Sequence, residues 1–229
     1  MRVIIVGGGL AGTNLAHVLA DSGHSVTLID RDPAVAARGF TEHGIAAIVG
    51  DGTEPRVLRE ADAGRADIVA AMLRRDADNL AVAAIVRDMG ARRVLARFRD
   101  PAYRSVLVHA GIDQIFGEVE TMVGALAVAI EYPRVRHSMV LGKGDSIAFE
   151  IVVPERAKAA GKTLKEIGSA SEFPRGVVIA GIAPPDGPVV VPRGDAIIHG
   201  GETVVLVARR EDVAHAIDYL TALAEPLLA

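Results

Sequence analysis

The sequence predicts an α/β protein with a doubly wound parallel sheet, followed by a second, smaller α+β domain. Short apolar runs alternate with helical patterns through the first 130 residues, and this alternation is typical of βαβ units. A glycine-rich turn, Gly7 to Gly12, follows the first apolar run and opens a helical stretch. Beyond Pro133 the pattern changes to strand-like runs separated by turn signals, which indicates a separate domain.

Each element of the first domain is predicted from its local pattern. Two helix starts are marked by a capping acid before a proline, Asp32 before Pro33 and Asp100 before Pro101, because proline suits the first helical position. The expected strands are 2–6, 25–30, 46–49, 67–71, 93–97 and 114–116, and the expected helices are 11–21, 33–43, 55–61, 77–89, 101–110 and 118–131. Right-handed crossovers between these strands give a Rossmann-type arrangement, which binds its ligand at the carboxyl ends of the strands.

The second domain is predicted from strand-like runs that turn signals such as Pro184–Gly187 separate. The runs lie at 146–153, 176–182, 188–191 and 203–208, and helical patterns lie at 164–167 and 211–224. Pro133 and Gly142–Gly144 interrupt the periodicity between the two parts, and such residues are typical of a boundary. We therefore expect a first domain at 1–132 and a second at 143–229.

The composition is that of an ordinary globular chain and limits the classes of partner. The chain has no cysteine, which excludes disulfides and thiolate metal sites. Its net charge of −4, with no aromatic residues interleaved among the basic pairs, argues against a nucleic-acid partner. The longest uninterrupted apolar stretch, Met122 to Ile130, is shorter than the roughly 20 residues of a membrane span. Because the first expected strand begins at residue 2, we also expect no signal peptide.

Gly7, Gly9 and Gly12 form a dinucleotide-binding fingerprint between a strand and a helix. The first glycine allows the tight turn, the second lets a pyrophosphate approach the backbone, and the third lets helix and strand pack closely. Asp30 ends the next apolar run, where a carboxylate accepts hydrogen bonds from an adenosine ribose. Its neighbour Arg31 favours a 2′-phosphate. Because the Asp30 carboxylate is present, however, we rank NAD(H), ADP or ATP above NADP as the ligand. A glycine-rich packing turn is the alternative interpretation.

Two further sets of residues, one in each domain, carry a family resemblance. In the first domain they are Gly7–Gly12, Asp30–Asp32, Gly50–Thr53, Asp67–Val69, Asp76–Leu80 and Ala96–Arg97, and in the second Ala160–Leu164, Pro174–Val177 and Val191–Asp195. In both sets the chain resembles the cytosolic Trk/Ktr-type regulators of potassium uptake, the RCK family. The second set makes the resemblance specific, because many enzymes share the first domain and a fold alone does not give function.

The resemblance implies a regulatory subunit that is not an enzyme. Members of the family are dimers, assembled into rings, that bind adenine nucleotides in the N-terminal domain and act on a membrane potassium channel or transporter. It therefore implies a homodimer or higher-order ring with that membrane protein as partner, in the cytoplasm and peripheral on the inner face of the cell membrane. A ligand controls such an assembly only by binding one of its shapes better than another.

The resemblance also implies roles for particular residues. The backbone of the glycine-rich turn would cradle the phosphates, through Gly7, Gly8, Gly9, Leu10, Ala11 and Gly12. Asp51 and Thr53 would lie beside the adenosine, and Arg97 would project from a strand end toward the phosphates. As alternatives, Asp51 and Thr53 cap the following helix, and Arg97 forms an ion pair at the surface.

Two departures from the family pattern affect the expected ligand. Some relatives that sense the third phosphate of ATP have an arginine where this chain has Leu10, and Met72 stands where the family often has threonine. We therefore expect NAD(H) or ADP ahead of ATP. Glu120 aligns with a glutamate that helps some relatives to bind a divalent cation, although one carboxylate is a poor site for a hard cation. A solvent-facing glutamate is the alternative.

An NAD-dependent oxidoreductase is the alternative function. It would need an acid or base near the nicotinamide, and the seven histidines show no catalytic pairing or metal-ligand spacing. A sensor of a cyclic dinucleotide, with its site in residues 143–229, is a third interpretation that the sequence leaves open.

The apolar helix at 119–130 serves either as a dimer contact or as part of the core.

Overall fold

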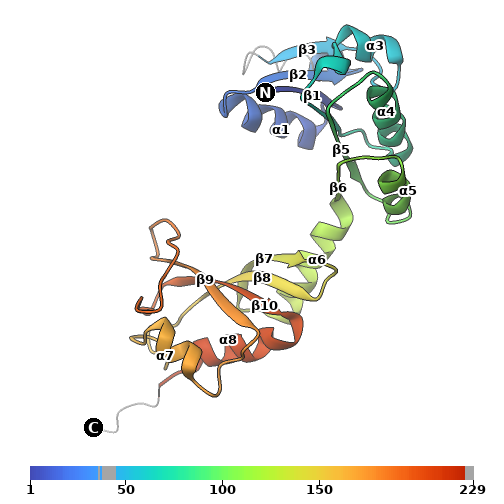
Figure 1. The fold of residues 1–229 in the computed structure, drawn as a ribbon. Helices are drawn as coiled ribbons and strands as arrows, with labels where there is room; N and C mark the ends of the chain where they lie inside the picture. The colour runs from blue at the N-terminus through green and yellow to red at the C-terminus, as the bar shows by residue number, and fades with distance from the viewer. Residues whose placement is uncertain (36, 38–44, 225–229) are drawn as a thin grey trace. The chain divides into compact units, whose positions relative to one another are not determined.

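The computed structural model describes residues 1–35, 37 and 45–224. The chain forms two compact units, Met1–Glu120 and Thr121–Ala229, which Figure 1 shows in blue to green and in yellow to red. Helix α6 (Glu118–Glu131) begins in the first unit and continues into the second. The domain ranges 1–132 and 143–229 stay a prediction. Within the described part of the chain, no helix combines the length and the apolar character that crossing a membrane requires.

The first unit contains a parallel sheet of six strands in the order β3-β2-β1-β4-β5-β6. The strands are β1 (Arg2–Val6), β2 (Ser25–Asp30), β3 (Ala46–Val49), β4 (Ile68–Ala71), β5 (Arg93–Phe98) and β6 (Gln114–Gly117). The order reverses at β1, which pairs with β2 on one side and β4 on the other. The predicted Rossmann-type sheet is confirmed, and its switch point lies beside β1, where this fold binds ligands.

Alternate residues of β1 supply the cores on the two faces of this sheet. Val3 and Ile5 pack with Ala16 of α1, whereas Ile4 and Val6 pack in a separate cluster with side chains of α3, α4 and α5. The helices are α1 (Leu10–Asp21), α3 (Pro55–Glu60), α4 (Asp76–Asp88) and α5 (Tyr103–His109), with a 3-10 turn η1 (Ala63–Arg65). Because successive side chains point to opposite faces, a strand covered on both faces must be apolar throughout.

One of the two predicted helix starts differs from the expectation, because α5 begins at Tyr103 with Ala102 as its N-cap, and Pro101 therefore does not take the first helical position. The Asp100 carboxylate accepts the N–H of Ala102 at 2.9 Å, just before α5. The Asp32 carboxylate accepts the N–H of Ala34 at 2.9 Å in the same way. Most of the helix expected at 33–43 lies outside the described residues.

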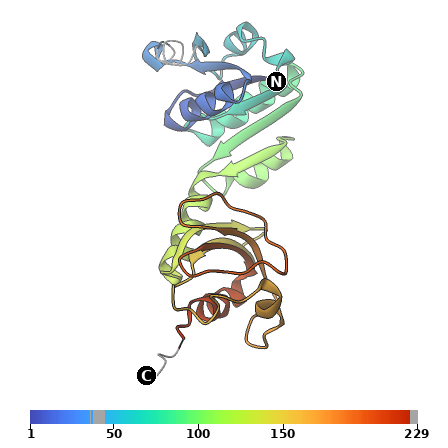
Figure 2. The same cartoon turned by 90° about the vertical axis from the view of Figure 1, so that its left-hand side faces the viewer.

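The second unit contains an antiparallel sheet of four strands in the order β7-β8-β10-β9. The strands are β7 (Val135–Leu141), β8 (Ser146–Val152), β9 (Val177–Ala183) and β10 (Thr203–Arg209), and the helical segments are α7 (Leu164–Ser169), the 3-10 turn η2 (Arg210–Asp212) and α8 (Val213–Thr221). Helix α8, drawn in red, packs against one side of the sheet (Figures 1 and 2). The expected second α+β fold is confirmed.

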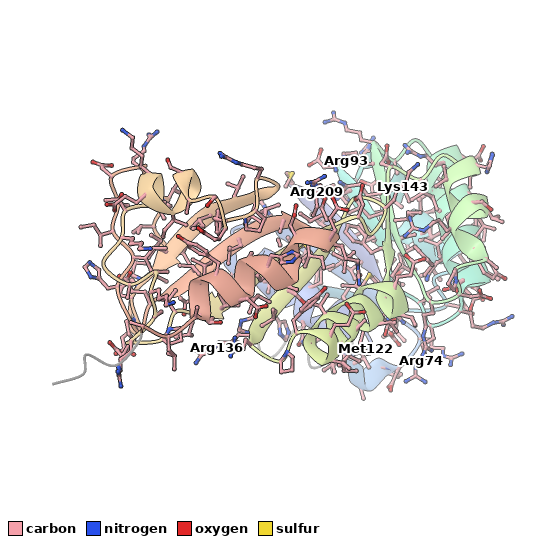
Figure 3. The ribbon with its side chains drawn as sticks, turned by 90° about the horizontal axis from the view of Figure 1, so that it is seen from below. Arg74, Arg93, Met122, Arg136, Lys143 and Arg209 are labelled. Atoms are coloured by element: carbon pink, nitrogen blue, oxygen red, sulfur yellow. The ribbon has the colours of Figure 1, made fainter. Side chains whose placement is uncertain are left out.

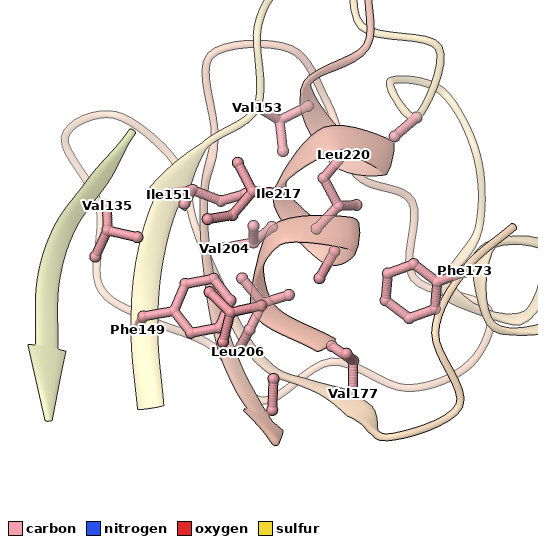
Figure 4. Close-up of a cluster of buried hydrophobic side chains, with 14 of the residues drawn as sticks. Val135, Phe149, Ile151, Val153, Phe173, Val177, Val204, Leu206, Ile217 and Leu220 are labelled. Atoms are coloured by element: carbon pink, nitrogen blue, oxygen red, sulfur yellow. The ribbon is translucent and has the colours of Figure 1, made fainter. Parts of the chain in front are cut away.

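The core of the second unit lies between α8 and the two central strands (Figure 4). The buried side chains of α8 recur at helical spacing and those of the strands at every second position: Val213, Ala216, Ile217 and Leu220 from the helix, Ile147, Phe149 and Ile151 from β8, and Val204 and Leu206 from β10. These are the two periodicities that an amphipathic helix on a half-buried sheet requires.

Two parts of the second unit differ from the expectation. Strand β7 lies in the segment that was expected to link the domains, and it was not predicted. Among the described strands it lies at the edge of the sheet and pairs with β8 alone. Arg136 and His137 interrupt its apolar alternation, as polar residues commonly do on edges. The strand expected at 188–191 is reduced to one isolated bridge between Val190 and Ile182.

Candidate functional site

The glycine-rich turn after β1 packs tightly against its surroundings. Gly7 has φ +112° and donates its N–H to the carbonyl of Ile29 at 2.8 Å. A Cβ added at Gly7 would lie 2.8 Å from the Met72 carbonyl oxygen, and one at Gly12 would lie 1.9 Å from the Gly7 carbonyl oxygen. Gly7 is required by its positive φ and its close approach to Met72, and Gly12 by its close approach to Gly7. These fingerprint glycines therefore set the turn and the helix packing here.

Gly9 differs from these two glycines because it faces open space. Nothing lies within 4 Å of a Cβ added at Gly9. Gly9 is the N-cap of α1, with no side-chain hydrogen bond at the cap and no acid in the first turn. The first backbone N–H groups of a helix have no partner within it, and they carry the positive end of its dipole. The turn therefore offers backbone donors to an anion such as a pyrophosphate.

Asp30 connects the end of β2 to this turn. Its carboxylate accepts the N–H of Gly8 at 2.6 Å and the N–H of Asp32 at 2.9 Å. Each carboxylate oxygen has about two lone-pair sites, so each can accept one more hydrogen bond. Asp30, which we expect to bind the ribose, therefore also holds the backbone of the glycine-rich turn. This is the turn that we expect to bind the phosphates.

Asp51 and Thr53 follow β3 in a short turn. The Asp51 carboxylate accepts the Thr53 hydroxyl at 2.7 Å and the Thr53 N–H at 2.9 Å. These hydrogen bonds, with a smaller contribution from the charge of Arg31, lower the pKa of Asp51 below its ordinary value. The N-cap of α3 is Glu54, and it has no side-chain hydrogen bond, so neither Asp51 nor Thr53 caps this helix. Arg31 itself is exposed.

Arg97 lies near the end of β5 and already has two partners. Its Nε donates to the Leu73 carbonyl at 3.1 Å, and its Nη1 donates to the Glu118 carboxylate at 2.9 Å. The side chain of Arg97 is only 15% exposed, whereas that of Glu118 is 49% exposed. Its guanidinium therefore takes part in an ion pair with the first residue of α6.

Two buried polar side chains of α4 hold the loops of the site, and sequence reasoning gave neither a role. Asn79 accepts the N–H of Leu73 at 2.8 Å and donates to the carbonyls of Leu73 and Arg97 at 3.0 Å each. Asp76 accepts the N–H groups of Arg99 and Asp100. Both residues belong to the run Asp76–Leu80, one of those that carry the family resemblance. An acid and an amide at the start of a predicted helix were the sequence signal that could have indicated this role.

Glu120, expected near a divalent cation, is the ion-pair partner of Arg104 instead. Hydrogen bonding to this carboxylate raises the pKa of the Arg104 guanidinium above its ordinary value. Throughout the residues described, no group of three or more histidine or acidic side chains is placed to hold a metal ion. A hard cation takes six or more oxygen ligands, so these residues do not fit a cation site.

Comparison with known proteins identifies both units. Residues 3–118 match the family model of the TrkA-N domain, and residues 148–221 match that of the TrkA-C domain. A TrkA homolog of the Trk potassium uptake system from Methanothermobacter thermautotrophicus is 29% identical over 216 residues, covering 94% of this chain and 97% of that protein. A TrkA homolog from Archaeoglobus fulgidus is 31% identical over 217 residues, covering 93% of this chain and 48% of that protein. The chain thus spans about half the length of this second relative.

Solved structures share the fold of the whole chain. The crystal structure of the GsuK RCK domain superposes with a TM-score of 0.65 at 21% identity, covering 98% of this chain and 48% of that one. The GsuK channel bound to NAD gives a TM-score of 0.66 at 20% identity, covering 98% of this chain and 40% of that one. At this identity the likeness shows the fold alone.

Proposed function

The chain belongs to the TrkA family of potassium-uptake proteins, and on this premise we propose that it is a regulatory subunit that binds an adenine nucleotide and controls a membrane potassium channel or transporter. The observation that carries the proposal is the open backbone at Gly9, at the switch point of the sheet. There a helix start without a side-chain cap faces free space, next to a carboxylate that is fixed at the end of β2.

The nucleotide would lie across the carboxyl ends of β3, β2 and β1. The N–H groups at the start of α1, from Gly9 through Leu10, Ala11 and Gly12, would hold the phosphates. Asp30 would accept the ribose hydroxyls through the lone pairs that the backbone leaves free. Asp51 and Thr53 would lie beside the adenosine, where the Gly50 N–H donates to the Asp30 carbonyl at 2.9 Å and keeps the two strand ends adjacent.

The NAD named with the GsuK channel belongs to that protein, and it supports an adenine dinucleotide as one candidate ligand here. We consider NAD(H), ADP and ATP as candidates. A divalent cation is not part of the proposal, because Glu120 has Arg104 as its partner.

A chain of contacts would link the bound nucleotide to α6. Gly7 packs against Met72 and Leu73, the Leu73 carbonyl accepts from Arg97, and Arg97 pairs with Glu118 at the start of α6. A phosphate that drew the Arg97 guanidinium toward itself would weaken the ion pair with Glu118. A nucleotide that binds better when this ion pair is broken would shift the protein toward the conformation without the ion pair.

We also propose that the chain assembles into a homodimer and a higher-order ring. Helix α6 exposes four large apolar side chains along its length, namely Met122, Val123, Leu126 and Ile130, and Figure 3 labels Met122 on this helix. Contiguous exposed apolar surface marks interaction sites, and a second copy of the chain is the partner that the proposal assigns to it. The assembly would act in the cytoplasm, peripheral on the inner face of the membrane.

The test is calorimetric titration of NADH, NAD, ADP and ATP into the full chain and into Asp30→Asn. We expect binding that the substitution weakens by roughly tenfold or more, because hydrogen bonds to a charged group contribute about 1.5–3 kcal/mol. The matched control is Asp21→Asn, which removes an exposed carboxylate at the far end of α1 and should leave binding unchanged. The recovered ligand should be chemically intact. Oxidation of NADH in the presence of small carbonyl compounds would favour an oxidoreductase instead.

A further inference from the structure

A pocket lies within the second unit, where the chain enters β7 and where β8 and α8 end. Its volume is about 430 Å³, which is within the range of about 300–1,000 Å³ that is usual for small-molecule sites. Two arginines, a hydroxyl and apolar side chains line it, namely Arg134, Arg136, Thr221, Val152, Pro154 and Leu223. All six belong to the second unit, and none of them belongs to the proposed nucleotide site. The pocket is therefore separate from the site at the glycine turn.

Arg134 is held beside this pocket by the end of α8. Its Nη1 donates to the Thr221 hydroxyl at 2.6 Å, and that hydroxyl donates its own proton to the Ile217 carbonyl at 2.7 Å. Thr221 is only 5% exposed, so this contact is anchored in the packed end of the helix. A guanidinium carries five N–H donors in a rigid fork, and the bond to Thr221 uses one of them. The charge of Arg134 is thus positioned while other donors stay available.

The positive charge of the pocket is not offset by an acid in its lining, as far as the described residues show. Arg134 approaches the Asp218 carboxylate only at 3.9 Å, and the two side chains are 61% and 79% exposed, so water screens this pair. Glu150, on the neighbouring strand, is 3.0 Å from His137. Over the ranges that the structure describes, the side chain of Arg136 has no ion pair or hydrogen bond. Arg136 therefore leaves a full positive charge unpaired here (Figure 3).

The rest of the lining is mostly apolar. Val152 and Pro154 are half-buried, and Leu223 is 62% exposed. A guanidinium fork suits a phosphate group, because it presents parallel N–H donors. A bare phosphate would leave the apolar side chains in water, whereas an apolar group on the ligand would cover them. The lining thus fits a phosphate that carries a compact apolar group.

We propose that this pocket binds a phosphomonoester with an apolar substituent, and that Arg134 and Arg136 hold its phosphate. The same head group occurs on soluble phosphomonoesters and on phosphatidic acid in a membrane. This ligand would be a second one, independent of the nucleotide proposed for the first unit. Because the lining comes from β7, β8 and the segment after α8, a bound ligand would join these three segments and stabilise the folded second unit.

The test is calorimetric titration of phenyl phosphate and of inorganic phosphate into the full chain, into Arg136→Gln and into a control, Lys143→Gln. Lys143 is an exposed cation in the turn between β7 and β8, so the control removes the same charge outside the pocket. We expect the wild type to bind phenyl phosphate more tightly than inorganic phosphate. Arg136→Gln should lower the affinity for phenyl phosphate roughly tenfold, while Lys143→Gln should keep it within about twofold.

A second variant, Leu223→Ser, tests the apolar part of the pocket. It should reduce the preference for phenyl phosphate over inorganic phosphate, because it replaces an exposed apolar side chain of the lining by a polar one. Sedimentation with phosphatidylcholine vesicles, with and without phosphatidic acid, identifies the source of the head group. Binding to vesicles that needs both phosphatidic acid and Arg136 would assign it to a lipid, whereas binding of phenyl phosphate without vesicle binding would assign it to a soluble compound.

Three results would overturn the inference. The first is a wild type that binds no phenyl phosphate, and the second is equal affinity for phenyl phosphate and inorganic phosphate. The third is binding that Arg136→Gln leaves unchanged, because the ligand would then lie elsewhere in the chain. ADP titrated into the same proteins should bind Arg136→Gln as it binds the wild type. A failure of this pocket therefore leaves the proposed nucleotide site standing, and a failure of ADP to bind leaves the pocket standing.

Discussion

The side-chain amide of Asn79 binds both backbone polar groups of Leu73, accepting its N–H at 2.8 Å and donating to its carbonyl at 3.0 Å. Asn79 is fully buried, and it also donates to the carbonyl of Arg97. One side chain therefore fixes the loop after β4 to the end of β5, next to the glycine turn.

Replacing Asn79 by alanine should lower the free energy of unfolding by about 2–3 kcal/mol, because it leaves buried backbone groups without partners. Urea denaturation of the full chain measures this change. Asp78→Ala is the matched control, since Asp78 has only a long surface ion pair with Arg75 and such pairs contribute about 0–1 kcal/mol. Equal effects of the two substitutions would contradict the structural role of Asn79.

Gly12 and Gly9 should respond differently to the same change. Gly12→Ala places a Cβ 1.9 Å from the Gly7 carbonyl oxygen, so helix and strand must separate, and we expect a loss of about 3 kcal/mol or more. Gly9→Ala meets nothing within 4 Å and should cost about 1 kcal/mol at most. Under the proposed function, it should nevertheless weaken nucleotide binding. Thermal unfolding and calorimetry distinguish the two effects, and a stable, nucleotide-binding Gly12→Ala protein would refute the packing argument.

Asp113 should contribute to acid sensitivity. The N–H of Val94, followed by the charge-assisted hydrogen bond from Arg87, lowers the pKa of Asp113 below its ordinary value. Because the folded pKa is lower than the unfolded one, this contribution is complete above the unfolded pKa of about 3.9 and is lost as pH falls through the folded pKa.

Denaturation between about pH 5 and pH 3 should therefore show a smaller loss of stability for Asp113→Asn than for the wild type. Part of the dependence should remain in the variant, since the pKa of Asp51 and that of Asp67 are also lowered. A pH profile that the substitution leaves unchanged would show that Asp113 is not involved.

Ile130 should report on assembly through α6. Its side chain is 79% exposed, so Ile130→Asp should leave stability within about 0.5 kcal/mol yet reduce the sedimentation mass of the proposed oligomer. Val18→Asp is the control, because Val18 is also exposed but lies on α1. A chain that sediments as a monomer, with nucleotide present, would exclude the proposed ring.

The sequence determined the parallel sheet and the glycine turn, because both depend on local patterns. Apolar runs of strand length and glycines at fixed spacing are visible along the chain, and the bounds of β1, β2 and β3 were predicted as the structure has them. Edge strand β7 escaped prediction, because Arg136 and His137 interrupt its apolar alternation, and charged residues are common on edge strands.

Only the tertiary structure decided the partners of the polar side chains. Arg97 is paired with Glu118, 21 positions along the chain, and Glu120 is paired with Arg104. Arg74 and Arg75 share a pocket with Arg99 because β4 and β5 are neighbours in the sheet. A local pattern specifies which face a residue takes, whereas hydrogen bonds and ion pairs act over a few ångströms between residues distant in sequence. The distances that select these partners exist only once the strands have paired.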